Sequence, residues 1–399
     1  MSWRPQKLDQ LGTLSRGRSR HRPRDAAHLY GGPYPFIQTS DVKHSGLYIR
    51  EYQQTYSEEG LRQSKIWPAG TLCITIAANI ADTAILGIDA CFPDSVIGFT
   101  ADENKSDVRF IKYLFDATIQ QRVRQFTQGA AQDNLSQEKL LSIEFLIPEL
   151  QEQRRIASIL SAYDDLIANN RRRIQLLEES ARLLYREWFV HLRFPGHEHT
   201  RIKDGIPEGW EKTTANNVMD VFSGGTPKTA NPAFWGGDIP FYTPRDSPES
   251  AYVATTGKML TEEGLRNCNS KLYPKDTVFI TARGTVGKIN LAQTAMAMNQ
   301  SCYALVARLP LNQFFLYYAL VNGVEQFRSR ASGAVFDAIV CDTFKLIPFI
   351  LPEPRLIEMF TGFVTPALRQ IDILSSQIRK LQSARDLLLP KLMSGEVAV

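Results

Sequence analysis

The densest group of chemically useful side chains is an arginine-rich stretch near the N-terminus, SRGRSRHRPR at residues 15–24. It holds five arginines and one histidine but no acidic residue: Arg16, Arg18, Arg20, His21, Arg22 and Arg24. Arginine can grip DNA phosphates or pair with both acceptors of guanine in the major groove. The interspersed glycine and proline predict a loop. Because the stretch itself holds no acid, this loop predicts a DNA contact, the alternative being a solvated surface loop.

A second group of polar residues follows two similar stretches, GGPYPFIQTSDV at 31–42 and GGDIPFYTPRDS at 236–247. In both, polar side chains come directly after an apolar run that is typical of a strand. The candidates for base contacts are Gln38 and Ser40 in the first stretch, and Thr243 and Arg245 in the second. Glutamine can pair with adenine and arginine with guanine. Asp41 and Asp246 could accept from cytosine but are equally suited to capping turns.

The remaining candidates lie in a glycine-rich loop and in the turns after two strand-like runs. The loop SGGTPKTANPAFWGG at 223–237 takes the place of the arginine stretch in the second half of the chain. The runs ITIAANIAD and FITARGTVGK are each followed by polar or basic residues. The candidates are Lys228 in the loop, Asn79 after the first run, and Arg283, Thr285 and Lys288 after the second. A tight turn with solvated charges is the competing interpretation.

Two patterns are similar to catalytic motifs but incomplete. NPAF at 231–234 departs from the NPPF/Y motif of amino-methyltransferases at its third residue, and no glycine-rich S-adenosylmethionine loop accompanies it. PD followed by ENK has the order found in metal-dependent nucleases, in which Asp94 and Glu103 would hold Mg²⁺ and Lys105 would steady the attacking water. The second half of the chain lacks this pattern. A stand-alone nuclease stays an alternative. We otherwise expect this chain to have no catalytic residues and no metal ligands.

Composition narrows the class of protein. The chain has 399 residues, of which 43% are hydrophobic and 22% charged, with a net charge of +4. This balance is typical of folded globular domains. The five cysteines form no CxxC pair, which argues against a zinc site or a disulfide framework. No apolar run is long enough to cross a bilayer and the first residues are not those of a signal peptide, so we expect a cytoplasmic protein without membrane contact.

The chain consists of two copies of one unit. SEEGLRQSKIWPAGTLCITI at 57–76 corresponds to TEEGLRNCNSKLYPKDTVFITA at 261–282, and EEGLR is identical in both. Tyr113 and Tyr317 lie at matching positions in two helix-like stretches. Each copy begins with a mixture of strand-like and helix-like runs, which predicts an α+β domain.

Each copy ends in a long helix with a heptad seam. Apolar residues alternate in steps of four and three, as in a coiled coil. The seam includes Ile156, Leu160, Ile167, Ile174, Leu177 and Leu184 in the first copy, and Ile371, Ile378, Leu381 and Leu388 in the second. Arg385 interrupts it, Pro390 should break or kink the second helix, and Asn170 either fixes the register or faces water. Because one such helix is not stable alone, we expect the two to pair as an antiparallel coiled coil.

This order of domain and helix, repeated once, resembles the specificity subunit of type I restriction–modification enzymes. The resemblance covers essentially the whole chain. It rests on GGPYPFIQTSDV, EEGLR and the helix entry IPELQEQRRIASIL in the first copy, and on WEKTTANNVMDVFSGGTP, LPEPRL and LLLPKLMSGEV in the second. It implies a first target recognition domain at 1–149, a spacer helix at 150–195, a linker at 196–206, a second recognition domain at 207–352 and a second helix at 353–395.

The resemblance also implies partners. Each recognition domain would read one half of a split, asymmetric site in double-stranded DNA, and the helices would set the spacing between the halves. Two DNA methyltransferase subunits, which bind S-adenosylmethionine, would dock on the chain, as would a restriction and translocase subunit that uses ATP and Mg. The chain itself would bind no cofactor and carry no catalytic centre, in a bacterial or archaeal cell. A coiled-coil scaffold that binds only protein is a further alternative, but it would not need a basic loop.

Overall fold

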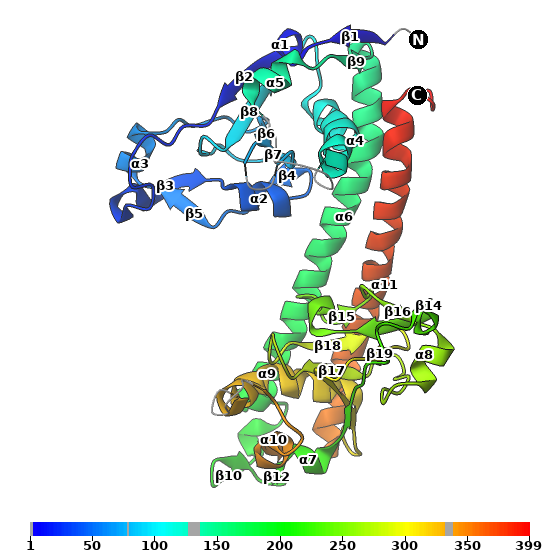
Figure 1. Cartoon of the computed structure of the whole chain (residues 1–399). Coiled ribbons are helices and arrows are strands. Elements are labelled where there is room, and N and C mark those ends of the chain that lie inside the picture. The colour runs from blue at the N-terminus through cyan, green and yellow to red at the C-terminus, as the bar shows by residue number, and fades with distance from the viewer. Residues whose placement is uncertain (1–2, 78–79, 127–135, 332–337) are drawn as a thin grey trace. The chain divides into compact units, whose positions relative to one another are not determined.

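The computed structural model describes residues 3–77, 80–126, 136–331 and 338–399, with the backbone alone at 120–126 and 330–331 (Figure 1). Contacts divide the chain into two compact units. Unit 1 comprises Met1–Asn169 and Arg379–Val399, and unit 2 comprises Asn170–Ile378. None of the helices in the described residues is long and apolar enough to cross a membrane.

Unit 1 is built on a five-stranded sheet in the order β2-β8-β6-β7-β4. Adjacent strands of this sheet are antiparallel, except for the parallel pair β4 and β7. The sheet strands are β2 (Gly12–Arg16), β4 (Tyr48–Ile49), β6 (Leu72–Thr75), β7 (Thr83–Leu86) and β8 (Val96–Ala101). Two further strand pairs join β1 (Arg4–Gln6) to β9 (Phe145–Ile147) and β3 (Tyr30–Phe36) to β5 (Gln54–Tyr56). The helices are α1 (Leu8–Leu11), α2 (Thr39–His44), α3 (Glu58–Arg62), α4 (Val108–Phe126) and α5 (Gln137–Ser142).

Unit 2 repeats this topology. Its five-stranded sheet has the order β13-β20-β17-β18-β15, which places first, last, third, fourth and second strands side by side as in unit 1. The strands are β13 (Met219–Ser223), β15 (Tyr252–Val253), β17 (Val278–Thr281), β18 (Ile289–Ala292) and β20 (Cys302–Ala307). The smaller sheets contain β10 (Ile202–Lys203) with β11 (Ile206–Pro207), β12 (Glu211–Thr214) with β21 (Pro348–Leu351), and β14 (Trp235–Tyr242) with β16 (Met259–Leu260) and β19 (Ala297–Met298). The helices are α7 (Ala215–Val218), α8 (Glu262–Arg266), α9 (Gln313–Ala331) and α10 (Thr343–Leu346).

The identical EEGLR segments form the short helices α3 and α8. In each, the hydroxyl of the preceding Ser or Thr caps the helix by accepting from the glycine N–H. A Cβ at Gly60 would lie 2.2 Å from the carbonyl oxygen of Leu29, and one at Gly264 would lie 2.2 Å from that of Phe234. The glycine is therefore required by close backbone packing in both copies.

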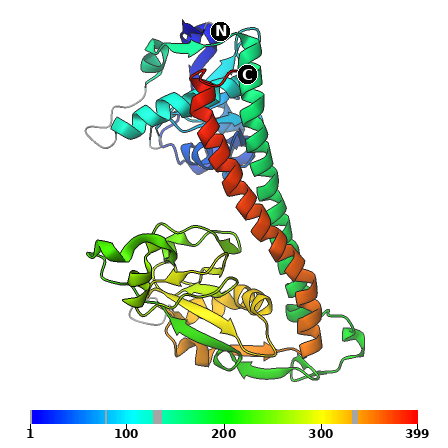
Figure 2. The same cartoon turned by 90° about the vertical axis from the view of Figure 1, so that its right-hand side faces the viewer.

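The two predicted long helices are present as α6 (Leu150–Tyr185), extended by a π-helical turn at Arg186–Val190, and α11 (Pro354–Met393). Each contributes residues to both units, and within each unit they lie side by side (Figures 1 and 2). In unit 2, Asn170 contacts Gln377 whereas Trp188 lies against Phe360, so the pairing is antiparallel as predicted. The α+β fold with an antiparallel helix pair is confirmed.

The heptad seam is mostly buried. Ile156, Leu160, Ile167, Ile174 and Ile371 are buried, while Leu177, Leu184, Ile378, Leu381 and Leu388 are partly buried. Asn170 does not face water, because it is buried and its Nδ2 donates to Gln377 Oε1 at 3.5 Å. Arg385 does not interrupt the packing either, since it forms an ion pair with buried Asp164. Of the break or kink expected at Pro390, the break does not occur, because α11 continues to Met393.

Candidate nucleic-acid interface

The arginine stretch begins at the end of β2 and is fixed there by backbone contacts. The N–H of Gly17 donates to the Val96 carbonyl at 2.8 Å, and that of Arg18 donates to the Phe92 carbonyl at 3.1 Å. A Cβ at Gly17 would lie 2.0 Å from the carbonyl oxygen of Pro93, so no larger residue fits without displacing the backbone. The loop therefore leaves the sheet in one defined direction.

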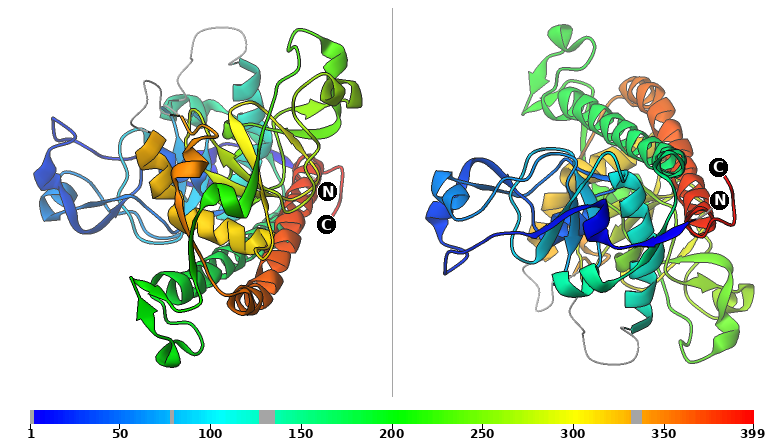
Figure 3. Two further views of the ribbon diagram at one scale, coloured as in Figure 1. Left: turned by 90° about the horizontal axis from the view of Figure 1, so that it is seen from below. Right: turned by 90° about the horizontal axis from the view of Figure 1, so that it is seen from above.

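Side chains at the end of α3 hold the middle of this loop. Gln63 Oε1 accepts from the backbone N–H of Arg20 at 2.6 Å and of His21 at 3.0 Å. Ser64 Oγ donates to the Arg18 carbonyl at 2.8 Å. These contacts lie on the side of unit 1 away from α6, where α3 and β3 are found (Figures 1 and 3). The loop is thus ordered by the fold, which suits it to present side chains outward.

Tyr30 secures the end of the loop. Its hydroxyl donates to the Arg24 carbonyl at 2.7 Å. Burial, followed by the neighbouring Tyr56, raises the pKa of Tyr30. The phenol therefore keeps its proton at physiological pH and remains a donor.

Three of the five arginines contact Asp94 of the same unit. Arg24 Nη2 lies 2.7 Å from Asp94 Oδ2 and Arg22 Nη2 lies 4.0 Å from the same oxygen. Arg16 Nε donates to the backbone carbonyl of Asp94. Asp94 lies far from the loop in the sequence, so its contact with these arginines could not be predicted from the residues next to them.

Arg18 and Arg20 differ from their neighbours. Both are exposed, and neither side chain has a hydrogen bond or an ion pair among the described residues. Their backbones are nevertheless fixed by the contacts to α3. Ordered backbone with an uncommitted guanidinium is the arrangement best suited to contact DNA.

The polar residues after β3 are largely used in local structure. Gln38 Nε2 donates to Gln54 Oε1 at 2.6 Å, and Asp41 Oδ2 accepts from the Gln38 N–H at 2.8 Å. Asp41 therefore caps α2. Ser40 is half-buried, and its carbonyl oxygen lies 2.8 Å from His44 Nδ1. Asn79 lies outside the described residues.

In unit 2 the polar residues after β14 are also used partly in local structure. Asp246 Oδ2 accepts from the N–H and the hydroxyl of Thr243 at 2.8 and 2.6 Å, so this pair closes a turn. Arg245 and Lys228 are exposed, and their side chains have no polar partner within the described part of the chain. Arg245 and Lys228 are thus the uncommitted cations here.

The turn between β17 and β18 likewise contains a cation with an acidic partner and residues that are exposed. Lys288 forms an ion pair with Glu249, which leaves this lysine neutralised. Thr285 is exposed and its carbonyl accepts from the Thr281 hydroxyl. Arg283 is exposed, and its backbone forms a β-bridge with Ala338.

The two copies differ most clearly at the position of Asp94. Its counterpart before β20 is Gln300, whose Oε1 accepts from the Thr226 hydroxyl. A neutral pair thus stands where unit 1 has an acid with its arginines. Sequence reasoning missed three residues that hold these loops in place: Asp94, Gln63 and Gln300. Only the alignment of the two repeats could have indicated Gln300.

The catalytic patterns have structural explanations. Asn231 Oδ1 accepts from the Ala233 N–H at 3.1 Å and caps a short turn at Pro232–Phe234. Asp94 is occupied by arginines, and Lys105 pairs with Asp102 at 3.1 Å. Within the described residues, no group of three histidine, cysteine or carboxylate side chains could hold a metal.

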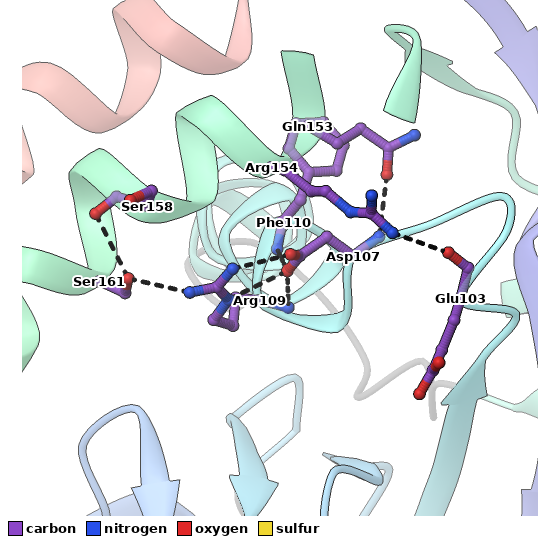
Figure 4. Close-up of polar contacts among 8 residues, drawn as sticks. All are labelled: Glu103, Asp107, Arg109, Phe110, Gln153, Arg154, Ser158 and Ser161. Atoms are coloured by element: carbon purple, nitrogen blue, oxygen red, sulfur yellow. Dashed lines mark hydrogen bonds and ion pairs between the residues drawn. The ribbon is translucent and has the colours of Figure 1, made fainter. Parts of the chain in front are cut away.

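A polar network joins the domain of unit 1 to α6 (Figure 4). Gln153 Oε1 accepts from the Asp107 N–H at 3.1 Å, and buried Gln153 also donates to the Lys105 carbonyl at 3.1 Å. Arg109 pairs with Asp107 at 2.8 Å and reaches Ser161 Oγ at 3.5 Å. Fixed hydrogen bonds of this kind position the domain, and with it the arginine loop, on the helix.

A duplicated α+β unit on an antiparallel helix pair, with uncommitted cations in each copy, defines a two-domain DNA-specificity protein. The model of the type I restriction modification DNA specificity domain matches residues 2–179 and 207–355, and the chain belongs to this family. The family is that of the subunits that recognise DNA, which are not catalytic.

Individual relatives match this chain over nearly the full length of both sequences. The chain is 24% identical over 411 residues to the type I restriction enzyme MjaIX specificity subunit of Methanocaldococcus jannaschii, covering 100% of this chain and 94% of the relative. It is 21% identical over 460 residues to the HindI specificity subunit of Haemophilus influenzae, covering 97% and 98%. The crystal structure of the S subunit from M. genitalium shares the fold, with a TM-score of 0.65, 16% identity and coverage of 98% and 96%. The nuclease and scaffold alternatives receive no support.

Proposed function

We propose that this chain selects a bipartite, asymmetric DNA sequence for a type I restriction–modification complex. The recognition domain at 1–149 would read one half of the site and that at 207–352 would read the other. The observation that carries this proposal is the repeated topology with different exposed polar residues. A shared scaffold with unlike contact residues reads two unlike sequences.

The proposed contacts in the first domain are Arg18 and Arg20, because both are exposed and uncommitted on an ordered backbone. In the second domain they are Lys228, Arg245 and Arg283. An arginine can read guanine in the major groove, whereas a lysine on a phosphate contributes affinity without sequence information.

We infer that methyltransferase subunits, two in number and carrying S-adenosylmethionine, dock along the long helices together with an ATP- and Mg-dependent restriction subunit. The support is that these helices keep large apolar side chains exposed. Examples are Leu166 at 49% and Leu387 at 70% in unit 1, and Leu183 at 47% and Phe363 at 63% in unit 2. Exposed apolar side chains mark a protein interface where they gather into one surface.

The test begins with the methylome of the native cell, sequenced with and without this gene. Methylation at a split asymmetric motif that disappears on deletion supports the proposal and supplies the target. An unchanged methylome, in a cell from which this chain recovers no methyltransferase, contradicts it.

Arg18→Ala and Arg20→Ala then test the loop, with DNA affinity of the complex measured on target and scrambled duplexes. A base contact predicts a loss of about 1–3 kcal/mol on the target alone. A phosphate contact predicts equal losses on both duplexes and a salt slope smaller by about 1. Arg4→Ala is the matched control, because Arg4 is an exposed arginine of unit 1 whose partner is Glu149 at 3.8 Å. No change from either loop variant rules out this assignment.

A further inference from the structure

Asp94 contacts three arginines of the loop. Its Oδ2 faces Arg24 at 2.7 Å and Arg22 at 4.0 Å, and its backbone carbonyl accepts from Arg16. Arg22 Nη1 also donates to the carbonyls of Ser19 and His21, both at 2.8 Å. Asp94 thus pairs closely with Arg24 and, together with the two carbonyls, retains Arg22, while Arg18 and Arg20 stay outside this set.

Stability does not account for this arrangement. The side chains of Arg22, Arg24 and Asp94 are 57%, 49% and 30% exposed. Ion pairs this open to water contribute little to folding, because solvent screens them and the side chains lose freedom. The backbone of the loop is already fixed through Gln63 and Ser64, which do not involve Asp94.

Electrostatics gives the carboxylate a different role. Each guanidinium that reaches a phosphate strengthens binding to any DNA sequence, because phosphates carry no sequence information. Five uncommitted arginines in one loop would favour non-target DNA as strongly as the target. An acid that retains some of them lowers this sequence-independent part and leaves the contacts of the remaining arginines.

The second copy supports this interpretation. Its counterpart of the loop contains Lys228 as its basic residue and no arginine, and the counterpart of Asp94 is the neutral Gln300. Where there is no excess of arginine to restrain, there is no acid. The copy with the arginine cluster is the one that carries the carboxylate.

We propose that Asp94 is a positioning residue of the arginine loop: by retaining Arg22 and Arg24 it lowers the sequence-independent part of DNA binding and leaves recognition to Arg18 and Arg20. This inference rests on the proposed reading of DNA by the arginine loop.

The test measures affinity of the full chain, in its complex, for a scrambled duplex and for the duplex defined by the methylome, across a series of salt concentrations. Asp94→Asn should bind the scrambled duplex more tightly, with a salt slope steeper by about 1 to 2 because each freed guanidinium that meets a phosphate adds about 0.9. The affinity for the target duplex should rise by a similar factor, because added phosphate contacts do not distinguish sequences. Asp94→Glu keeps the charge and should stay close to the unmodified chain.

Two controls separate this effect from damage to the fold and from a general change in charge. Asp102→Asn removes the same charge from an ion pair with Lys105, at the other end of β8 from Asp94, and should leave the slope unchanged. In the Asp94→Asn background, Arg22→Gln with Arg24→Gln should return the slope to its original value, which a disordered loop would not do.

The outcomes are distinct. Tighter binding to the scrambled duplex with reversal by the arginine substitutions supports the proposal. Weaker binding to both duplexes, or an unchanged slope, overturns it and leaves Asp94 a structural residue at most. If Arg18→Ala and Arg20→Ala also have no effect, the proposed reading of DNA by this loop fails as well, whereas their loss of binding beside a silent Asp94→Asn overturns the role of Asp94 alone.

Discussion

Replacing Asp164 with alanine should loosen the C-terminal part of α11 from α6 within unit 1. The Asp164 side chain is 7% exposed and forms an ion pair with Arg385, which is 26% exposed. It also accepts a hydrogen bond from the Tyr113 hydroxyl at 2.5 Å. Burial, followed by the charge of Asp164, raises the pKa of Tyr113, so the phenol remains a donor. The substitution leaves the buried Tyr113 hydroxyl without its acceptor and removes one of the two acidic partners of Arg385.

The size of the effect follows from these partners. Breaking a buried ion pair by removing one member costs about 3–5 kcal/mol, because the remaining charge is uncompensated. Arg385 keeps Asp386, to which it donates at 3.0 and 2.8 Å, and it is partly exposed. The lower end, about 3 kcal/mol, is therefore expected. If α11 opens locally, amide exchange there should become about 100-fold faster.

Hydrogen–deuterium exchange of the full chain, followed over residues 381–393, measures this local opening. The other copy supplies a matched control, because Leu368 and Ala181 occupy the positions that correspond to Asp164 and Arg385 and are buried in the core of unit 2. Asp164→Leu with Arg385→Ala and Tyr113→Phe should therefore exchange within about tenfold of the unmodified chain, since apolar replacement of a buried pair is often neutral.

Two results would refute the reasoning. Unchanged exchange in Asp164→Ala would mean that the ion pair contributes nothing to holding α11. A triple variant as labile as the single variant would mean that the charges stabilise more than the apolar contact of the other copy.

Two further predictions concern packing and exposure. Gly264→Ala places a Cβ 2.2 Å from the Phe234 carbonyl and should destabilise unit 2 by about 1–3 kcal/mol in thermal or urea unfolding, whereas Gly323→Ala, with no atom within 4 Å, should be neutral or stabilising; equal effects would contradict the packing argument. Iodoacetamide followed by peptide mass mapping should label exposed Cys341 rapidly and leave Cys73 unmodified in the native chain, because burial raises the pKa of the Cys73 thiol; early labelling of Cys73 would refute its burial.

The parts of the fold that could be predicted from the sequence are those set by local periodicity. Heptad spacing identified both long helices, and the identical EEGLR segments identified the repeat, because apolar spacing and a required glycine leave marks within a few residues. The antiparallel pairing followed from the need of two apolar faces to cover one another.

The polar contacts could not be predicted in the same way. The partner of Arg24 is Asp94 and that of Arg385 is Asp164, each far along the chain. Periodicity shows which face of an element is buried, but it does not show which charged residue of the facing element lies opposite. From the sequence alone, Arg385 is therefore predicted to interrupt the seam, and Asp94 is not identified as the acid that contacts the arginine loop.

Comparison of the two copies shows how the polar residues diverge. Asp164 and Arg385 are replaced together by Leu368 and Ala181, because a lone buried charge would cost more than either pair. Asp94 accompanies the arginines of its loop, and Gln300 accompanies a loop without them. Charges in this protein thus change as sets of contacting residues. The two recognition domains therefore differ by whole groups of contacting residues. Exchanging a single residue between the copies should destabilise the domain more than exchanging the whole group.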